Sequence, residues 1–154
     1  MAKQFIKIEV EAGGVKRLKN APRRMKKGAR KGVRLGMKML REEARKFDGV
    51  NIPKIRTGNL RDSISYEIKE SGDEIVGFLG SDALYAKIQE FGGVITASRA
   101  KYLVFKTSQG WRKVTQVKIP PRPFLKPAIE SHKDMFEDIV QREILRGWKS
   151  RGMF

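Results

Sequence analysis

Few side chains in this sequence have the chemistry needed for catalysis, and their spacing matches no catalytic pattern. The 154-residue chain has no cysteine and one histidine, His132. Thiolate nucleophiles, disulfides and cysteine-based zinc sites are therefore excluded. The scattered carboxylates Asp62, Asp82 and Glu90 could bind a divalent cation if the fold gathered them, but loop caps and surface ion pairs are commoner roles for such acids. There is no phosphate-binding glycine loop and no Ser-His-Asp signature. We expect a non-enzymatic protein that holds no metal and no cofactor.

The histidine and the aromatic residues each allow two interpretations. His132 lies on an apolar stripe near the C-terminus, and a partly buried core position is the interpretation we favour. Several aromatic residues have the shape to stack on nucleic-acid bases, yet at strand and helix spacing they more often belong to a core. These residues are Tyr85, Phe91, Tyr102, Phe105 and Trp111.

The positive charge is concentrated in the first part of the chain. The formal net charge is +17, and residues 1–61 hold 19 Lys and Arg against 5 Asp and Glu, whereas residues 62–154 hold 15 against 12. Such an excess predicts an acidic partner, whether nucleic acid, an acidic protein surface or anionic lipid.

Residues 20–47 are predicted to form a long amphipathic helix. Its apolar residues recur three or four positions apart from Met25 to Phe47, and Lys and Arg occupy most other positions. With 14 basic residues against 2 acidic ones in positions 16–46, few internal ion pairs are expected, so the basic side of the helix is predicted to contact an acidic partner. The candidate residues on that side are Lys26, Lys27, Arg30, Lys31, Arg34 and Arg41.

Three glycines four residues apart, Gly28, Gly32 and Gly36, lie within this helix, where each costs about 1 kcal/mol relative to alanine. They indicate either a stripe that lets another backbone or a phosphate chain approach closely, or a flexible or bent helix. The sequence leaves both interpretations open, although a close approach by the acidic partner would suit the basic face.

The remaining pattern predicts a single α+β domain with an antiparallel sheet. Residues 4–11 alternate as a strand, residues 64–68 and 75–79 form a first hairpin, and residues 101–105 and 114–119 form a second hairpin around 107–111. A short helix ending at Gly92 separates the hairpins, and a Pro-rich turn leads into a last helix over 127–148. The expected segments are an N-terminal strand and turn (1–19), a basic helix (20–48), a sheet with a short helix (57–119), and a turn with a C-terminal helix (120–148). No stretch reaches the length of a membrane span, and we expect folding in the cytoplasm.

The stretch "RTGNLRDSI" at residues 56–64 has the composition of a turn between the long helix and the sheet. Thr57, Gly58 and Asn59 favour a tight turn, Leu60 and Ile64 are expected to face inward, and Asn59 and Asp62 are candidates to bond the loop backbone. Nothing in this stretch requires catalysis.

Three short motifs occur in order along the chain and resemble those of one protein family. They are "RTGNLRDSI", "YAKIQEFGG" and "PPRPFLKPAI". Their order and spacing are similar to the tail-completion, or head-to-tail joining, family of minor virion proteins of tailed bacteriophages and to the related phage virion morphogenesis proteins, over about residues 20–145. Gly93 and the long segment to Ile119 are closer to the morphogenesis branch. The matching residues are Thr57, Gly58, Leu60, Ser63 and Ile64, then Tyr85, Ala86, Glu90, Phe91 and Gly92, then Arg122, Pro123, Phe124, Leu125, Pro127 and Ala128.

The resemblance implies a structural virion protein of the neck or upper tail that completes the tail and joins it to the head. It implies a ring of identical subunits around the DNA channel, with hexameric symmetry, contacts to other neck or tail proteins, and assembly in the host cytoplasm. DNA in the channel or an acidic protein surface would face the basic helix. A nucleic-acid-binding module that uses the basic helix is the alternative, and a metal-dependent nuclease is a third.

Overall fold

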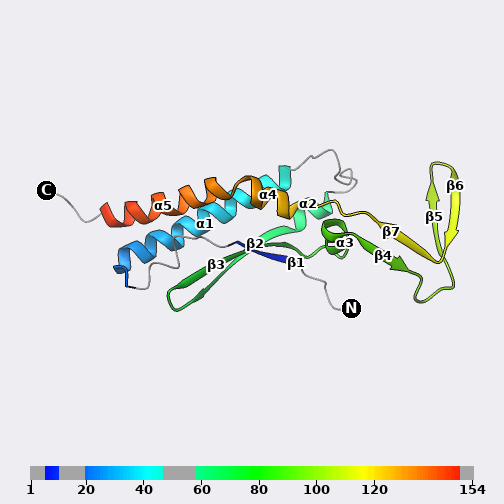
Figure 1. Ribbon diagram of the computed structural model, residues 1–154, viewed down its shortest axis with the longest axis horizontal. Coiled ribbons are helices and arrows are strands. Elements are labelled where there is room, and N and C mark those ends of the chain that lie inside the picture. The colour runs from blue at the N-terminus through cyan, green and yellow to red at the C-terminus, as the bar shows by residue number, and fades with distance from the viewer. Residues whose placement is uncertain (1–5, 11–19, 47–57, 150–154) are drawn as a thin grey trace.

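The computed structural model describes residues 6–10, 20–46 and 58–149, which form an α+β fold (Figure 1). The elements in chain order are β1 (Ile6–Val10), α1 (Arg23–Lys46), α2 (Asn59–Ser63), β2 (Ile64–Ser71), β3 (Glu74–Ser81), α3 (Ala86–Phe91), β4 (Gly93–Thr96), β5 (Leu103–Thr107), β6 (Gly110–Val114), β7 (Gln116–Ile119), α4 (Leu125–Ser131) and α5 (Lys133–Lys149). The predicted fold class and the long N-terminal helix are confirmed.

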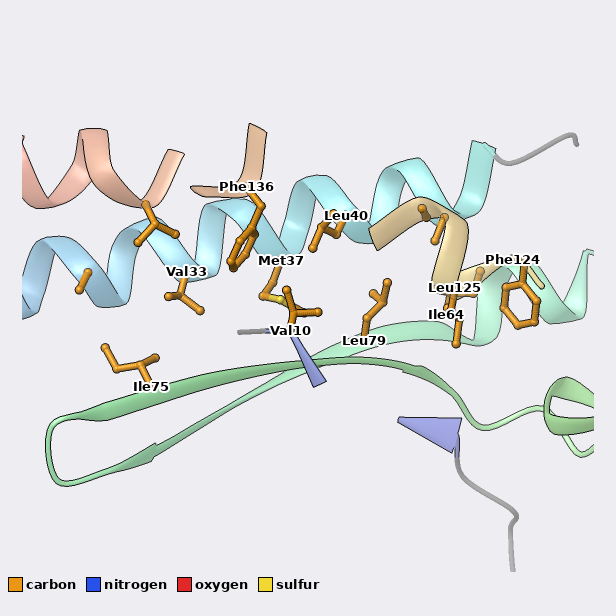
Figure 2. Close-up of a cluster of buried hydrophobic side chains, with 14 of the residues drawn as sticks. Val10, Val33, Met37, Leu40, Ile64, Ile75, Leu79, Phe124, Leu125 and Phe136 are labelled. Atoms are coloured by element: carbon orange, nitrogen blue, oxygen red, sulfur yellow. The ribbon is translucent and has the colours of Figure 1, made fainter. Parts of the chain in front are cut away.

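The body of the protein is a three-stranded antiparallel sheet covered on one face by helices. The strand order is β1-β3-β2, so the N-terminal strand and the first hairpin join as predicted around a central β3. Helix α1 packs on β2 and β3, and α5 packs along α1. Figure 2 shows Val33, Met37 and Leu40 of α1 above Leu79 of β3, with Phe136 of α5 reaching into the same cluster. The stripe predicted from Ala29 to Ala44 therefore forms the core, whereas Phe47 lies outside the described residues.

The glycine series of α1 is where α5 approaches. A Cβ on Gly28 would lie 2.4 Å from the carbonyl oxygen of Glu143, and a Cβ on Gly32 would lie 2.7 Å from the Cα of Val140. A Cβ on Gly36 would lie 2.4 Å from the ring of Phe136. The close-approach interpretation is confirmed, but the approaching backbone belongs to the same chain, so these glycines are not open to an external partner as we had expected.

Gly32→Ala is expected to lower the melting temperature, although the same change on an exposed helix would stabilise it by about 1 kcal/mol. The added methyl group meets backbone in the middle of both helices, and overpacking of this kind costs about 1–3 kcal/mol. Thermal unfolding followed by circular dichroism measures the effect. Gln141→Ala, an exposed change on α5, is the control and should have little effect. A more stable Gly32→Ala variant would contradict the close packing.

Residues 93–119 form an arm that projects from the body (Figure 1). Strand β4 pairs with β7 near the body, and β5 pairs with β6 at the tip. The predicted second hairpin is therefore wrong in its return strand, because β6 at 110–114 turns back on β5 while residues 116–119 pair with β4. Its short turn at Ser108 and Gln109 explains the difference, since the side chain of Thr107 accepts a hydrogen bond from Gln109 N–H at 3.2 Å and closes the turn early.

The predicted C-terminal helix is two helices, α4 and α5, which meet at His132. The Nδ1 of His132 lies 3.0 Å from the carbonyl oxygen of Ala128, and its Nε2 lies 3.7 Å from a carboxylate oxygen of Glu43. The partly buried position expected for His132 is confirmed. Within α5, Phe136, Val140 and Ile144 are buried, whereas Met135 and Trp148 are exposed.

Candidate functional site at the meeting point of the motifs

The first motif forms the corner between α1 and the sheet. Gly58 has a φ of 73°, a left-handed conformation that favours glycine, and its carbonyl oxygen accepts the N–H of Asp62 at 2.9 Å. The hydroxyl of Ser63 donates to the carbonyl oxygen of Leu60 at 2.7 Å and lies 2.6 Å from the hydroxyl of Ser81 on β3. Thr57 lies outside the described residues. The turn therefore includes one short helix that leads directly into β2.

Two details of the first motif differ from expectation. No side-chain hydrogen bond caps α2, and Asp62 lies 3.4 Å from the guanidinium of Arg61 instead of bonding the backbone. Leu60 and Ile64 do face the core, as predicted, with Ile64 fully buried. A guanidinium nitrogen of Arg45 on α1 donates to the carbonyl oxygen of Ile64 at 3.1 Å. The contact joins the long basic helix to the start of the sheet.

Glu90 connects the second motif to the third. Its side chain is only 3% exposed, and its carboxylate accepts three backbone N–H groups at the start of α4. These come from Phe124 at 2.7 Å, Leu125 at 3.0 Å and Lys126 at 2.9 Å. The first N–H groups of a helix have no partner within the helix and carry partial positive charge, so a carboxylate from elsewhere in the chain satisfies both needs.

The residues next to Glu90 also contact the Pro-rich turn that precedes α4. The N–H of Arg122 donates to the carbonyl oxygen of Gln89 at 2.6 Å. Gly92 has a φ of 68°, and a Cβ there would lie 2.7 Å from the nitrogen of Pro121. No other residue fits this close approach without displacing the Pro-rich turn. The chain leaving α3 and the chain entering α4 are thus bonded side by side at the base of the arm.

The third motif divides into buried and exposed residues. Phe124 and Leu125 are buried, and Figure 2 shows both beside Ile64 at one end of the core. Arg122 and Pro123 are exposed. Tyr85 and Phe91 of the second motif are exposed as well, at 41% and 58%, while Ala86 is buried. The motifs therefore build a rigid corner whose outer surface carries aromatic side chains.

The carboxylates considered as metal ligands do not converge. Glu90 is occupied by backbone N–H groups, Asp62 lies beside Arg61, and Asp82 is exposed. Among the described residues, no group of three or more His, Cys, Asp and Glu side chains could hold a metal ion. The chemistry that this corner performs is structural hydrogen bonding.

The basic face of α1 has more internal partners than the sequence predicts. Lys26 pairs with Asp73, and Arg30 lies 2.7 Å from a carboxylate oxygen of Glu70, both on the β2–β3 hairpin. Lys31 lies 3.0 Å from Glu143 of α5, and Arg41 lies 2.7 Å from Glu42. The acids that relieve the charge come from distant parts of the chain, which composition within the helix does not reveal. In the described part of the chain, Lys27 and Arg34 are exposed and make no ion pair.

Glu143 is the buried acid of the α1–α5 contact. Hydrogen bonds from Lys31 and then Arg146, whose nitrogen lies 2.6 Å away, lower the pKa of Glu143 below its ordinary value, although burial opposes the shift. The same residues line a hollow of about 330 Å³, together with Arg24 and Lys27. Its lining holds four basic side chains against one acid. Two of these cations, Lys31 and Arg146, are bonded to Glu143 itself.

The aromatic residues of the arm are not a core. Trp111 is 73% exposed, and Phe105 is also exposed, while Tyr102 is partly covered by the ammonium of Lys113, 4.2 Å from its ring centre. The core interpretation of these residues is wrong, because the arm consists of two-stranded sheets on which no described helix or strand packs extensively. Alternation within a strand does not show whether a second layer covers it.

No helix in the described part of the chain is long and apolar enough to cross a membrane.

Comparison with known proteins supports the family inferred from the motifs. The model of the HK97-gp10-like family, described as "Bacteriophage HK97-gp10, putative tail-component", matches residues 15–92. The match covers half of the chain and includes the basic helix and the first two motifs, but it is shorter than the 20–145 expected. No curated protein and no solved structure gives a significant match. The chain belongs to the HK97-gp10-like family of bacteriophage tail components.

Proposed function

We propose that this tail component is a non-enzymatic ring subunit of the neck or upper tail, which completes the tail and joins it to the head around the DNA channel. The observation that carries the proposal is the family match across α1, the first motif and the second motif. The geometry of those motifs supports it, since their polar groups are used to fix a corner of the fold and leave no reactive cluster. A ring of identical copies, six by family expectation, contacts other neck or tail proteins.

The basic face of α1 is the surface that we assign to the acidic neighbour, either the next ring or the DNA in the channel. Of the six candidate cations, Lys27 and Arg34 form no ion pair within the described residues, and the hollow between α1 and α5 extends this face. Lys26, Arg30, Lys31 and Arg41 form internal ion pairs that an external acid has to compete with. The partner of Lys31, Glu143, is buried, but the other pairs are partly exposed, and exposed pairs contribute only about 0–1 kcal/mol, so exchange is feasible for Lys26, Arg30 and Arg41.

Changing Lys27 and Arg34 together to glutamine is expected to leave folding intact and to yield tails that fail to join heads or to eject DNA. Both side chains are exposed and unpaired, so their charge matters only if a partner uses it. Complementation of a phage that lacks this chain, with particles counted by electron microscopy and infectivity by plaque assay, measures the result. Lys69→Gln with Lys87→Gln removes equal charge from exposed positions outside α1 and is the control, which should give normal particles. Infectious particles at normal yield would show that the charge serves solvation alone.

A nucleic-acid-binding module is the second candidate, and the four basic side chains of the hollow favour it. The two functions predict different behaviour in salt. A ring subunit forms a defined oligomer whose contacts tolerate salt, whereas a monomer bound to DNA through phosphates loses affinity steeply as salt rises. Light scattering at two salt concentrations, with and without a DNA duplex, separates them.

A further inference from the structure

The strands of the arm at residues 93–119 make few contacts with the body of the protein. None of its four strands packs extensively on another element, and each strand pairs with one other strand only. Isolated two-stranded sheets are marginally stable in water. The arm nevertheless carries large exposed side chains, with Val94 at 56%, Val104 at 61% and Trp111 at 73%. An exposed apolar surface rimmed by polar groups is typical of a protein-binding site.

The charge of the arm limits what can cover it. Residues 93–119 contain six basic residues and no acidic residue. A partner that buries the apolar side chains must therefore also bring acidic groups beside them, since uncompensated like charges in an interface are costly. The basic residues are Arg99, Lys101, Lys106, Arg112, Lys113 and Lys118.

A matching surface exists on α5 of the same chain. Asp134, Asp138, Gln141, Leu145 and Trp148 follow one another three or four positions apart, so they share one outward stripe of the helix. Leu145 and Trp148 are 55% and 52% exposed. Neither Asp134 nor Asp138 forms an ion pair within the described residues. The stripe thus offers acidic groups and apolar side chains together, as the arm requires.

A groove continues this stripe toward the sheet. It has a volume of about 280 Å³ and lies among β1, α4 and α5. Its lining includes Val10, Leu40 and Phe136 together with Glu9, Glu137 and Lys133. Neither Glu9 nor Glu137 is in an ion pair within the described part of the chain. The groove adds depth and two further acids to the outer stripe of α5.

The arm and the α5 stripe of one molecule lie at different ends of it. Figure 1 shows β5 and β6 at the end opposite to the C-terminal end of α5. We propose that the arm of each copy docks on the α5 stripe and its groove in the next copy. Because the two surfaces differ, the contact is heterologous, and repeated rotation closes it into a ring. This inference rests on the proposed ring function and names the surfaces that form it.

Charge reversal on either surface tests the contact. Lys106→Glu with Lys113→Glu, on the same face of the β5–β6 hairpin as Val104 and Trp111, or Asp134→Lys with Asp138→Lys on α5, should each raise the concentration needed for self-association by about tenfold or more, since like charges then meet across the interface. Sedimentation velocity of the full chain at low salt over a range of concentrations measures this. The quadruple variant, with both surfaces reversed, should recover association. Lys69→Glu with Lys87→Glu, exposed changes on β2 and α3, is the control and should match the unmodified chain.

Four results would overturn the proposal. The first is a chain that stays monomeric at every concentration, and the second is a pair of reversal variants that associate like the unmodified chain. The third is a quadruple variant that does not recover self-association. The fourth is an arm reversal that abolishes binding to a DNA duplex while self-association persists. The last result would make the arm a nucleic-acid surface. Failure of the docking proposal can be told apart from failure of the proposed function. The proposed function is judged by whether the chain is present at the head–tail junction of particles. A chain located there whose arm variants assemble normally refutes the docking alone.

Discussion

Glu90→Ala is expected to lower the free energy of unfolding by about 3–5 kcal/mol, because each buried N–H left without a partner costs about 1–3 kcal/mol. The carboxylate holds the N–H groups of Phe124, Leu125 and Lys126 at the start of α4. Alanine leaves the buried donors of Phe124 and Leu125 without a partner, and the part-buried donor of Lys126 as well. For a protein of this size the loss lowers the melting temperature by roughly 10 °C. Differential scanning calorimetry measures it.

Two further variants isolate the cause of this effect. Glu90→Gln keeps one acceptor oxygen and the shape of the side chain, so it should fall between the unmodified chain and the alanine variant. Asp82→Ala removes an exposed carboxylate from the same segment and should change stability by no more than about 0.5 kcal/mol. If Glu90→Ala melts at the same temperature as Asp82→Ala, then the buried carboxylate does not hold α4 in place.

Local signals in the sequence were sufficient for the body of the fold. The spacing of Val33, Met37 and Leu40 identifies the buried side of α1, and alternation in residues 64–79 identifies the first hairpin. These patterns are informative because side chains return to the same face about every 3.6 residues in a helix and every 2 residues in a strand. The second hairpin was placed wrongly, since the segment 101–119 offers two apolar return strands and periodicity does not choose between them.

Ion pairs and hydrogen bonds between residues far apart in the chain could not be predicted from the sequence. The pairing of Arg30 with Glu70 and of Lys31 with Glu143 depends on which elements become neighbours, and the net charge of the helix concealed it. Glu90 was recognised as part of a motif, but its role was not. One feature of the sequence pointed to this role, because the residue at the cap position of α4 is Phe124 and not Ser, Thr, Asp or Asn. A helix start of this kind needs an acceptor from another segment.

The glycine series shows how a pattern can be correct while its assignment is wrong. Gly28, Gly32 and Gly36 do mark a close contact, and α5 fills it. The sequence suggested an external partner because the glycines lie among lysines and arginines. The contact that the glycines allow is with α5, which packs along α1. Surface available for assembly is therefore found elsewhere, on Lys27 and Arg34, on Phe91, and along the arm.

Phe124→Ala is expected to cost about 3–5 kcal/mol, the usual loss for a large-to-small change in a packed core. The ring is 2% exposed and packs at the end of the core that α4 and β2 share. The Pro-rich turn holds this residue in place through the N–H that Glu90 binds. Its removal should loosen the corner from which the arm projects, so assembly should fail even below the melting temperature. Thermal unfolding and sedimentation velocity measure the two effects.

Phe91→Ala is the matched control for this prediction, since it deletes the same ring from an exposed position in the neighbouring motif. Its side chain is 58% exposed, so the melting temperature should stay within the small range typical of surface changes, about 0.5 kcal/mol in stability. Any loss of assembly in Phe91→Ala then reports a contact between subunits, because the fold is intact. A Phe124→Ala chain with an unchanged melting temperature and unchanged oligomer size would show that the ring is neither a core residue nor an anchor for the arm. The two phenylalanines thus separate folding from assembly at one corner of the protein.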